Sequence, residues 1–405
     1  MKILIVNLGD SNGGASIAAN RLQECLMNEG VDSKLLVLNK KNKNQNILTV
    51  NTFFSKSVVF FSKLETKLVS LFYPKKTTNR FSASLIGFNL ITRVINSYKP
   101  DIVHLHWVQS GMLSISDISK IKKPIVWSLH DVWGFTGGCH YNENCKNFEK
   151  TCGSCKVLGS TKFNDLSGVV YSAKQKSYEK HGNITFIGLS KWMAQLAKKS
   201  SLSKGKVINL PNPIDTRIYK RNSKLDSLSF FGMDHKNNNI LIGAMSLKIE
   251  RKGFKKFLGS TKHITSNFNL ITFGESSVEN SKISHTVLNV GIISKVNEMV
   301  MLYNASCVTV VPSLEENLSN VIMESLACGT PVVAFDIGGN SDMITHKVNG
   351  YLAIPFDEID LARGVDWVLN NKEITLSENA IEKVQNDFDY PVVAKKYLEF
   401  YKKII

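Results

Sequence analysis

The 405-residue sequence contains no apolar run of the roughly 20 residues that a helix needs to span a bilayer. It also shows no signature of a nucleic-acid-binding module, although the chain is strongly basic. Acidic residues are few, 34 against 50 lysines and arginines, which gives a net charge of +16. These absences argue against a membrane-spanning protein and against a nucleic-acid partner, so the basic charge needs another explanation.

The N-terminal sequence is too short for a signal peptide before the first predicted strand, at residues 3–6. We therefore expect a cytoplasmic protein, in which the seven cysteines are thiols or metal ligands rather than disulfides. A chain of this length, with 43% hydrophobic residues, is expected to form two globular domains that each bury a core.

The basic charge is concentrated between Lys34 and Arg80, where Glu65 is the only acidic residue. Inside this segment apolar residues recur at the spacing of one helix face. They are Phe54, Val58, Phe61, Leu64, Leu68 and Leu71, and the face is widened by Phe53, Val59, Phe60, Val69 and Phe72. A basic amphipathic helix over residues 53–72 either packs on its own domain or lies on an anionic membrane leaflet, where each Lys or Arg contributes about 1 kcal/mol.

Short apolar strands alternate with helical stretches along the whole chain, which predicts an α/β protein with parallel sheets. We expect two Rossmann-like domains, residues 1–215 and 216–388, and a last helix within 389–405 that crosses back to the first domain. Residues 219–238 are polar and irregular, which indicates a linker. The predicted strands are residues 3–6, 34–38, 102–106, 125–129, 185–189, 207–210, 239–244, 270–273, 287–290, 307–311, 332–335 and 350–353.

The most informative segment follows the predicted strand at 307–311. Pro312 stops that strand, and Ser319 or Asn320 can cap a helix that runs to Gly329. Two carboxylates result, Glu316 in the loop before the helix and Glu324 inside it. Free backbone N–H groups at a helix N-terminus favour phosphate oxygens, so the segment predicts a site for a phosphorylated small molecule.

The spacing Glu316, seven residues, Glu324, and then Gly-Thr-Pro-Val-Val resembles the donor-binding motif of retaining glycosyltransferases of family four. These enzymes have the GT-B fold, in which two Rossmann-like domains face each other across a cleft. The resemblance implies that Glu316 is catalytic and contacts the transferred sugar, and that Glu324 binds the ribose. The backbone at Asn317, Leu318, Ser319 and Asn320 would approach the sugar and the diphosphate. The alternative, two solvated helix residues, is disfavoured by the strand–loop–helix–strand context.

Two further loops match the same family. Gly13 and Gly14 open a helix after the first strand and would border the donor diphosphate or the acceptor; a plain strand-to-helix turn is the alternative. The family places an Arg and a Lys six residues apart after the strand at 239–244. Lys252 matches the Lys, but Ser246 stands at the Arg position, so Arg251 or Lys248 would have to replace it. A solvated charge cluster is the alternative at that loop.

His130 ends the predicted strand 125–129 and begins the string His-Asp-Val-Trp-Gly-Phe-Thr-Gly-Gly-Cys-His-Tyr. The string resembles a subgroup of these transferases that builds bacterial surface polysaccharides. The resemblance implies that His130 is catalytic, close to the transferred sugar. A lone His is more often structural, but this one lies at the carboxyl end of a parallel strand, where clefts form.

Four cysteines follow in a loop over residues 139–155: Cys139, Cys145, Cys152 and Cys155. Four thiolates suffice for a tetrahedral structural zinc site, and Cys152 and Cys155 have the two-residue spacing of a metal knuckle. His140 could replace one of them. The five residues between Cys139 and Cys145 exceed the usual spacing, and unliganded thiols or a disulfide pair remain as alternatives.

The resemblance implies a retaining glycosyltransferase that moves a hexose-type sugar from a UDP- or GDP-sugar to a glycan or lipid-linked saccharide, in capsule, exopolysaccharide or lipopolysaccharide assembly. No Asp-x-Asp pair follows a suitable strand, so we expect no cofactor for catalysis, only a structural zinc. Lipid-linked acceptors favour a peripheral location on the cytoplasmic face of the inner membrane. The alternatives are a GT-B nucleotide-sugar epimerase, against which segment 53–72 and the Cys-rich loop argue, and a non-catalytic nucleotide-sugar-binding protein.

Overall fold

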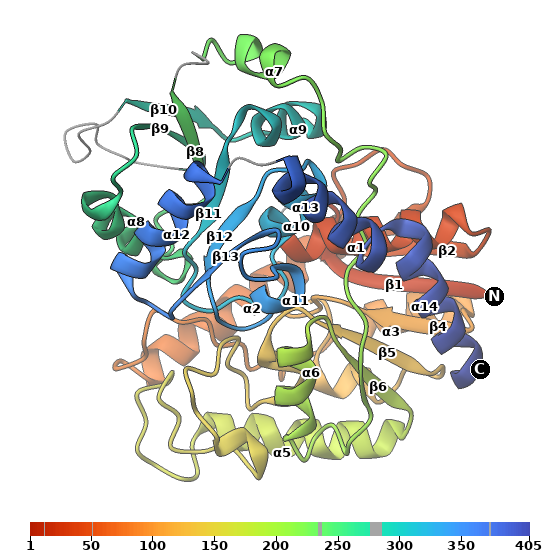
Figure 1. The fold of residues 1–405 in the computed structure, drawn as a ribbon. Helices are drawn as coiled ribbons and strands as arrows, with labels where there is room; N and C mark the ends of the chain where they lie inside the picture. Colours follow the sequence, from red (N-terminus) through yellow and green to blue (C-terminus); the bar gives the residue numbers. More distant parts are fainter. Residues whose placement is uncertain (12, 51, 234–236, 276–285, 372–373) are drawn as a thin grey trace. The chain divides into compact units, whose positions relative to one another are not determined.

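The computed structural model describes residues 1–405 except 12, 51, 234–236, 276–285 and 372–373 (Figure 1). The side chains of Phe53 and Phe54, which belong to the predicted amphipathic face, also lie outside the described residues. The chain divides into two compact units. Unit 1 comprises Met1–Asn212 and Ala394–Ile405, and unit 2 comprises Pro213–Val393.

Unit 1 is built on a seven-stranded parallel sheet in the order β3-β2-β1-β4-β5-β6-β7. Its strands are β1 (Lys2–Gly9), β2 (Asp32–Asn39), β3 (Ile47–Thr49), β4 (Ile102–Leu105), β5 (Ile125–Leu129), β6 (Ile184–Gly188) and β7 (Val207–Asn209). Because all strands are parallel, the loops that follow β1, β4 and β5 leave the sheet at the same edge.

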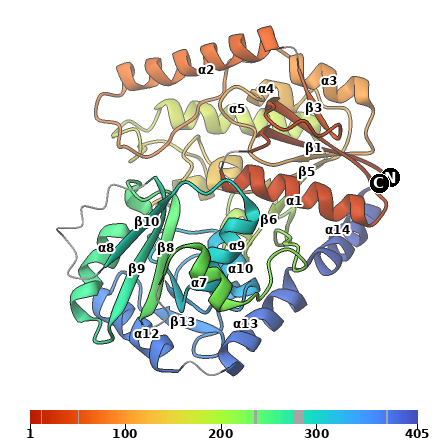
Figure 2. The same ribbon diagram turned by 90° about the horizontal axis from the view of Figure 1, so that it is seen from above.

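Helices cover both faces of this sheet, with α1 on the face opposite α2 and α5 (Figure 2). The helices are α1 (Gly14–Asn28), α2 (Thr52–Phe72), α3 (Leu90–Tyr98), α4 (Ile115–Ile118), α5 (Leu166–His181), α6 (Lys191–Lys198) and α14 (Tyr390–Ile404). Two short 3-10 turns, η1 (Val132–Phe135) and η2 (Asn147–Glu149), interrupt the long connection between β5 and α5. The predicted helix over residues 53–72 is therefore confirmed as α2.

Unit 2 is built on a six-stranded parallel sheet in the order β10-β9-β8-β11-β12-β13. Its strands are β8 (Asn238–Ser246), β9 (Phe268–Glu275), β10 (Val287–Gly291), β11 (Val308–Val311), β12 (Val332–Phe335) and β13 (Gly350–Ala353). Its helices are α7 (Lys224–Phe230), α8 (Phe254–Ser260), α9 (Val296–Ala305), α10 (Asn320–Ala327), α11 (Asn340–Met343), α12 (Glu358–Asn370) and α13 (Ile374–Asp387), with 3-10 turns η3 (Glu250–Lys252) and η4 (Thr261–His263).

The predicted strands are all present, and the short strand β3 is additional. The prediction of an irregular linker over residues 219–238 is wrong in part, because α7 lies inside it. Ser223 caps this helix, since its side chain accepts a hydrogen bond from the backbone N–H of Asp226. The side chain of Leu228, on the apolar side of the helix, is buried.

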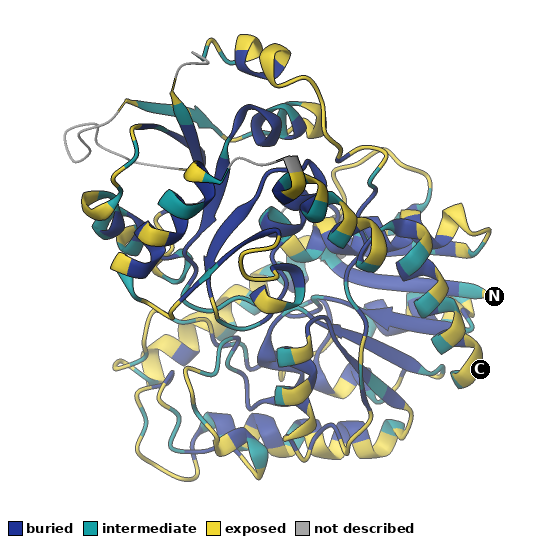
Figure 3. Ribbon diagram, in the orientation of Figure 1, coloured by how far each residue is buried: buried dark blue, intermediate teal, exposed yellow. Residues whose placement is uncertain are grey.

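Each unit has its own apolar core between its sheet and its helices, and the strands of both sheets are largely buried (Figure 3). Near-continuous apolar strands are expected where a parallel sheet is covered on both faces. In the part of the chain that the structure describes, no helix is both long and apolar enough to cross a membrane.

Candidate functional site

In unit 2, the loop between β11 and α10 presents the carboxylate of Glu316. Ser319 is the N-cap of α10, and its side chain accepts a hydrogen bond from the backbone N–H of Ile322. Asn317, Leu318 and Ser319 are buried, and Asn320 is the first residue of the helix. The helix thus starts directly after the loop, as the spacing predicts, and its first N–H groups follow the Glu316 carboxylate in the chain.

Two cations from the loop after β8 meet this carboxylate. Lys252 Nζ donates to Glu316 Oε2 at 2.7 Å, and Arg251 Nη1 lies 3.9 Å from the same oxygen. Ser313 Oγ also donates to Glu316 Oε2, at 3.2 Å. Burial alone would raise the pKa of Glu316, but the Lys252 and Arg251 charges and the hydrogen bonds from Lys252 and Ser313 outweigh it, so the pKa is lowered. Glu316 is therefore a carboxylate at neutral pH.

Tight backbone packing holds these two loops in place. Gly253 has φ +70°, and a Cβ there would lie 1.7 Å from the carbonyl oxygen of Pro312. Gly338, with φ +55°, approaches the other side, where a Cβ would lie 1.8 Å from the carbonyl oxygen of Glu316. Arg251 Nη1 also donates to the carbonyl oxygen of Glu315 at 2.7 Å. The position of Glu316 therefore depends on glycines that allow close backbone approach.

The neighbouring lysine does not join this cluster. Lys248 is exposed and lies 3.4 Å from Glu275 Oε1, and Ser246 is buried at the end of β8. Of the two residues that could replace the missing Arg, only Arg251 thus reaches Glu316.

Glu324 lies in the fifth position of α10 and is 6% exposed. Its Oε2 accepts a hydrogen bond from the buried Tyr303 hydroxyl at 2.8 Å. Tyr303 therefore orients one carboxylate oxygen. The sequence analysis missed Tyr303, because nothing in the chain pattern links a residue of α9 to one of α10.

In unit 1, the loop after β1 leads into α1 through Gly13, which has φ +88° and is the N-cap. No side-chain hydrogen bond caps this helix, and a Cβ on Gly13 would meet nothing within 4 Å. Gly14 begins the helix, while residue 12 lies outside the described residues. The two glycines are therefore followed by helix N–H groups, as the prediction of an anion-binding turn requires.

His130, at the carboxyl end of β5, is half-buried and contacts a pair of buried imidazoles, His106 and His104, that could not be identified from the sequence. His130 Nε2 and His106 Nδ1 share a hydrogen bond at 2.8 Å, and the rings of His106 and His104 lie 4.7 Å apart. His104 is bonded to the Tyr401 hydroxyl and to Ser128 Oγ, at 2.6 and 2.8 Å. The sequence places His104 and His106 on β4, but local pattern does not show that β4 pairs with β5.

Burial keeps these imidazoles neutral. It lowers the pKa of His104 to about 3, with a further contribution from His130. It lowers the pKa of His130 to about 4, although the nearby Asp131 charge opposes the shift, and it lowers the pKa of His106 well below the ordinary value. His106 Nε2 is buried and has no hydrogen-bond partner in the structure.

The acid next to His130 organises the loop behind it. Asp131 Oδ2 accepts hydrogen bonds from Trp107 Nε1 at 2.8 Å and from His140 Nδ1 at 2.7 Å, and Oδ1 accepts from the backbone N–H of Trp133 at 2.9 Å. Burial would raise the pKa of Asp131, but His140 and these hydrogen bonds lower it. His140 Nε2 bonds to Ser82 Oγ at 2.9 Å, so both of its ring nitrogens are engaged and it is not available as a metal ligand.

The four cysteines of the 139–155 loop line one pocket, and the seven cysteines of the chain form no disulfide in the structure. Within the described part of the chain, no three His, Cys, Asp or Glu side chains are arranged as a metal-ligand set.

Two family models and several known proteins match this chain. Residues 230–387 match the family described as glycosyl transferases group 1, and residues 21–151 match the glycosyl transferase 4-like family. The chain is 24% identical over 349 residues to the putative colanic acid biosynthesis glycosyl transferase WcaC of Escherichia coli, covering 82% of this chain and 83% of that protein.

A second relative is the N,N'-diacetylbacillosaminyl-diphospho-undecaprenol alpha-1,3-N-acetylgalactosaminyltransferase of Campylobacter jejuni. It is 26% identical over 179 residues, which are 42% of this chain and 47% of that protein. Among solved structures, HepE of Anabaena in complex with UDP has a TM-score of 0.67 at 15% identity and covers the whole of both chains. At that identity the likeness establishes the fold.

Proposed function

Because the chain belongs to the family-four glycosyltransferases and has their GT-B fold, we propose that it transfers a hexose-type sugar from a UDP- or GDP-sugar to a glycan or lipid-linked saccharide, with retention of configuration. The observation that carries this proposal is the cluster of Lys252 and Arg251 on Glu316, directly before the N-terminus of α10. It places two cations and a carboxylate directly before the N-terminus of α10.

Each part of this cluster suits one part of a sugar nucleotide. The diphosphate carries the negative charge, which Lys252, Arg251 and the first N–H groups of α10 would balance. The Glu316 carboxylate, ionised at neutral pH, would accept hydrogen bonds from two neighbouring sugar hydroxyls. Glu324, with one oxygen held by Tyr303, would accept from a ribose hydroxyl. HepE was solved with UDP, so UDP-sugars are the first donors to test.

The proposed reaction is a front-face displacement. The bond from the sugar C1 to the diphosphate oxygen breaks, and the bond from C1 to the acceptor oxygen forms on the same face. The acceptor proton passes to the leaving diphosphate oxygen. Lys252 and the helix N–H groups stabilise the charge that develops on the diphosphate, and His130, neutral at pH 7, would bind the sugar as a hydrogen-bond partner.

The donor site is tested first by thermal shift with UDP, GDP, ADP and their sugar conjugates. A ligand at 100 times its Kd adds about 2.7 kcal/mol of stability. Lys252→Ala removes a charge-assisted hydrogen bond worth about 1.5–3 kcal/mol, so the Kd for the preferred nucleotide should rise roughly 10- to 100-fold. Lys248→Ala is the matched control, because Lys248 faces Glu275 instead. Equal effects of the two variants would place the diphosphate elsewhere.

The reaction itself is tested with the donor that binds. The anomeric configuration of the product, read by NMR, must equal that of the donor; an inverted product contradicts front-face displacement. A sugar released or epimerised without acceptor would instead indicate the nucleotide-sugar epimerase, and binding without turnover would indicate a binding protein.

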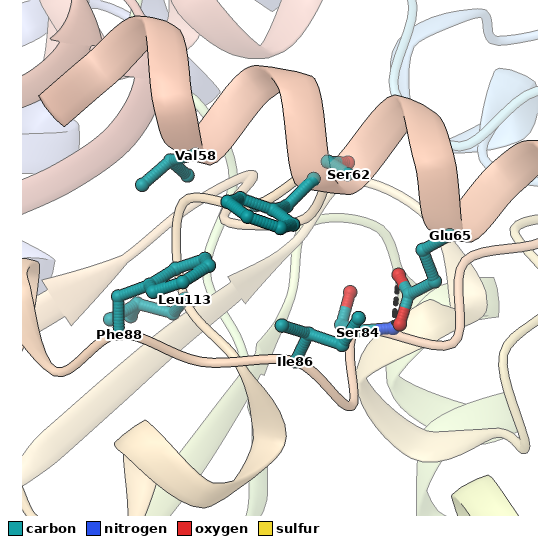
Figure 4. A pocket seen from close by; sticks show the side chains of 9 residues that line it. Val58, Ser62, Glu65, Ser84, Ile86, Phe88 and Leu113 are labelled. Carbon is teal, nitrogen blue, oxygen red and sulfur yellow. Dashed lines mark hydrogen bonds between the residues drawn. The ribbon is translucent and has the colours of Figure 1, made fainter. Parts of the chain in front are cut away.

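A surface on α2 supports a lipid-linked acceptor and peripheral membrane contact. Val58 and Val69 are buried against unit 1, while Phe60, Leu71 and Phe72 are exposed by 63%, 73% and 72%. The loop at residues 84–88 packs beside α2, where Glu65 accepts hydrogen bonds from the backbone N–H groups of Ser84 and Leu85 (Figure 4). Exposed apolar side chains flanked by Lys63 and Lys67 suit an anionic leaflet, and the Campylobacter relative is named for an undecaprenol-linked acceptor.

Sedimentation with vesicles tests this surface. We expect binding to vesicles that contain anionic phosphatidylglycerol and little binding to phosphatidylcholine alone, with loss of binding in the double variant Leu71→Asp and Phe72→Asp. Leu225→Asp is the control, because Leu225 is equally exposed, by 68%, on α7 of unit 2. Unchanged binding of the α2 variant would show that its apolar side chains do not contact the membrane.

A further inference from the structure

The loop between η1 and α5 is long and has almost no regular structure of its own. Between Phe135 and Leu166 only η2 interrupts it. Its path nevertheless returns repeatedly to one point, because Cys139, Cys145, Cys152 and Cys155 line the same pocket. Burial raises the pKa of the Cys139, Cys152 and Cys155 thiols, so these three groups are protonated when no metal is bound.

Backbone N–H groups point at two of the sulfur atoms. The N–H of Gly137 donates to Cys152 Sγ at 3.2 Å, and the N–H groups of Val157 and Leu158 are directed at Cys155 Sγ. Donors two and three residues after a cysteine stabilise a thiolate, because the partial positive charge of each N–H faces the negative sulfur. Gly137 permits this contact, since a Cβ there would lie 2.6 Å from Cys152 Cβ.

A buried cation lies beside the same thiols. Lys174, on α5, has no exposed surface, and its ammonium donates to the carbonyl oxygens of Trp133 and Thr136. Its charge interacts with Cys139 and Cys152. Burial lowers the pKa of Lys174 to about 7, and its Nζ lies 3.4 Å from the centroid of the Trp133 ring.

We propose that Cys139, Cys145, Cys152 and Cys155 bind one Zn²⁺ as four thiolates, forming a structural site that holds the 136–165 loop against unit 1. Four thiolates and one Zn²⁺ carry a net charge of −2, which the N–H groups and Lys174 offset. In the structure the four Sγ atoms line one pocket but are not arranged as a ligand set, so zinc binding requires the loop and its side chains to rearrange. Zinc binding releases the thiol protons and breaks no other bond.

The ligand set is restricted to the cysteines. His140 is engaged at both ring nitrogens, by Asp131 and Ser82, so it does not complete the shell. Zn²⁺ suits such a site because it has no redox chemistry and binds four thiolates in a tetrahedral geometry. Sugar transfer includes no electron-transfer step that would need a redox metal.

The first test is the metal content of the full chain, purified in reducing buffer without a metal-affinity tag. Mass spectrometry of the metals should find one zinc per chain, and X-ray absorption should find four sulfur ligands at about 2.3 Å. Less than a tenth of an equivalent of zinc, iron in its place, or nitrogen ligands in the shell would each overturn the proposal. These measurements need no variant, so a folding defect cannot obscure them.

Single substitutions then locate the site. Cys152→Ser and Cys155→Ser should lose at least nine-tenths of the bound zinc, whereas Cys307→Ser in unit 2 should keep it all. Retention of zinc by both knuckle variants would overturn the assignment. Alkylation of the denatured wild-type chain distinguishes a metal site from a disulfide. Without reductant and after zinc removal, seven modified cysteines support the metal site. Five or fewer modified cysteines indicate a disulfide and contradict the metal site. None of these outcomes depends on sugar transfer, so failure of the zinc site would leave the proposed activity untouched.

Discussion

The buried histidines of unit 1 should make the protein lose stability as the pH falls below 6.5. Burial lowers the pKa of His104 to about 3 and that of His130 to about 4, and it lowers the pKa of His106 well below its ordinary value. In the unfolded chain each titrates near its ordinary value of 6.5. Below pH 6.5 the unfolded state therefore binds protons that the folded state does not, so stability falls as the pH falls.

The size of the effect follows from the number of protons. Each histidine lowers the free energy of unfolding by about 1.4 kcal/mol for every pH unit between 6.5 and its folded pKa. Three of them together give about 4 kcal/mol per unit, against a typical domain stability of about 5–15 kcal/mol. Unit 1 should therefore unfold between pH 6 and 4. The carboxylate of Glu316 in unit 2, whose folded pKa is lowered, begins to lose its contribution only below about pH 4.5, where the histidines of unit 1 have already lost much of theirs.

Urea titrations at pH 7, 6 and 5, followed by the fluorescence of the buried Trp127 and Trp133, measure this slope. His104→Gln removes one titrating group while leaving an amide near Tyr401 and Ser128, so it should reduce the slope by about a third. His263→Gln, at an exposed position, should leave it unchanged. Parallel lines for wild type and His104→Gln would refute the assignment of the protons to this cluster.

Three substitutions near the donor loop have expected effects of different size. Gly338→Ala places a Cβ against the carbonyl oxygen of Glu316, so it should destabilise unit 2 and abolish nucleotide binding. Gly291→Ala is the control, because Gly291 also has a positive φ but a Cβ there meets no other atom. It should lower the free energy of unfolding in urea by only about 1 kcal/mol. Tyr303→Phe removes the hydrogen bond that the Tyr303 hydroxyl donates to the buried Glu324 carboxylate, which should cost about 1–3 kcal/mol and weaken nucleotide binding measured by calorimetry. Ser319→Ala removes the cap of α10 and should lower stability by about 1 kcal/mol by the same urea assay; no change would show that the cap is not formed in solution.

Most of the fold is predictable because the buried strands have strong local signatures. β11 is a β-branched run that ends directly before Pro312, and α10 ends at Ala327, two residues before Gly329, whose φ is +77°. β3 escapes prediction because three residues in a polar stretch form a strand only by pairing with β2. Ser223 is a recognisable N-cap for α7, but the polar composition of residues 219–238 led to the prediction of an irregular linker.

The donor loop shows which contacts the sequence can and cannot specify. β8 and β11 are neighbours, so the loops that carry Lys252 and Glu316 leave the sheet side by side. The sequence does not show which lysine of the loop pairs with Glu316. Lys248 and Lys252 lie on the same loop, and the turn η3 between them decides that Lys252 faces Glu316 while Lys248 faces Glu275. That turn depends on Gly253 packing against Pro312, a contact between residues about 60 positions apart.

Two polar side chains that follow β4 lower the stability of the fold in a way that the sequence does not show. His106 Nε2 and Gln109 Oε1 are buried without a hydrogen-bond partner in the structure, and each such group costs about 1–3 kcal/mol. Native folds keep few groups of this kind, and they retain them where a ligand completes the hydrogen bonds. Since His106 is bonded to His130, the proposed sugar contact, the hydroxyl groups of a bound sugar are suitable partners, because each can both donate and accept.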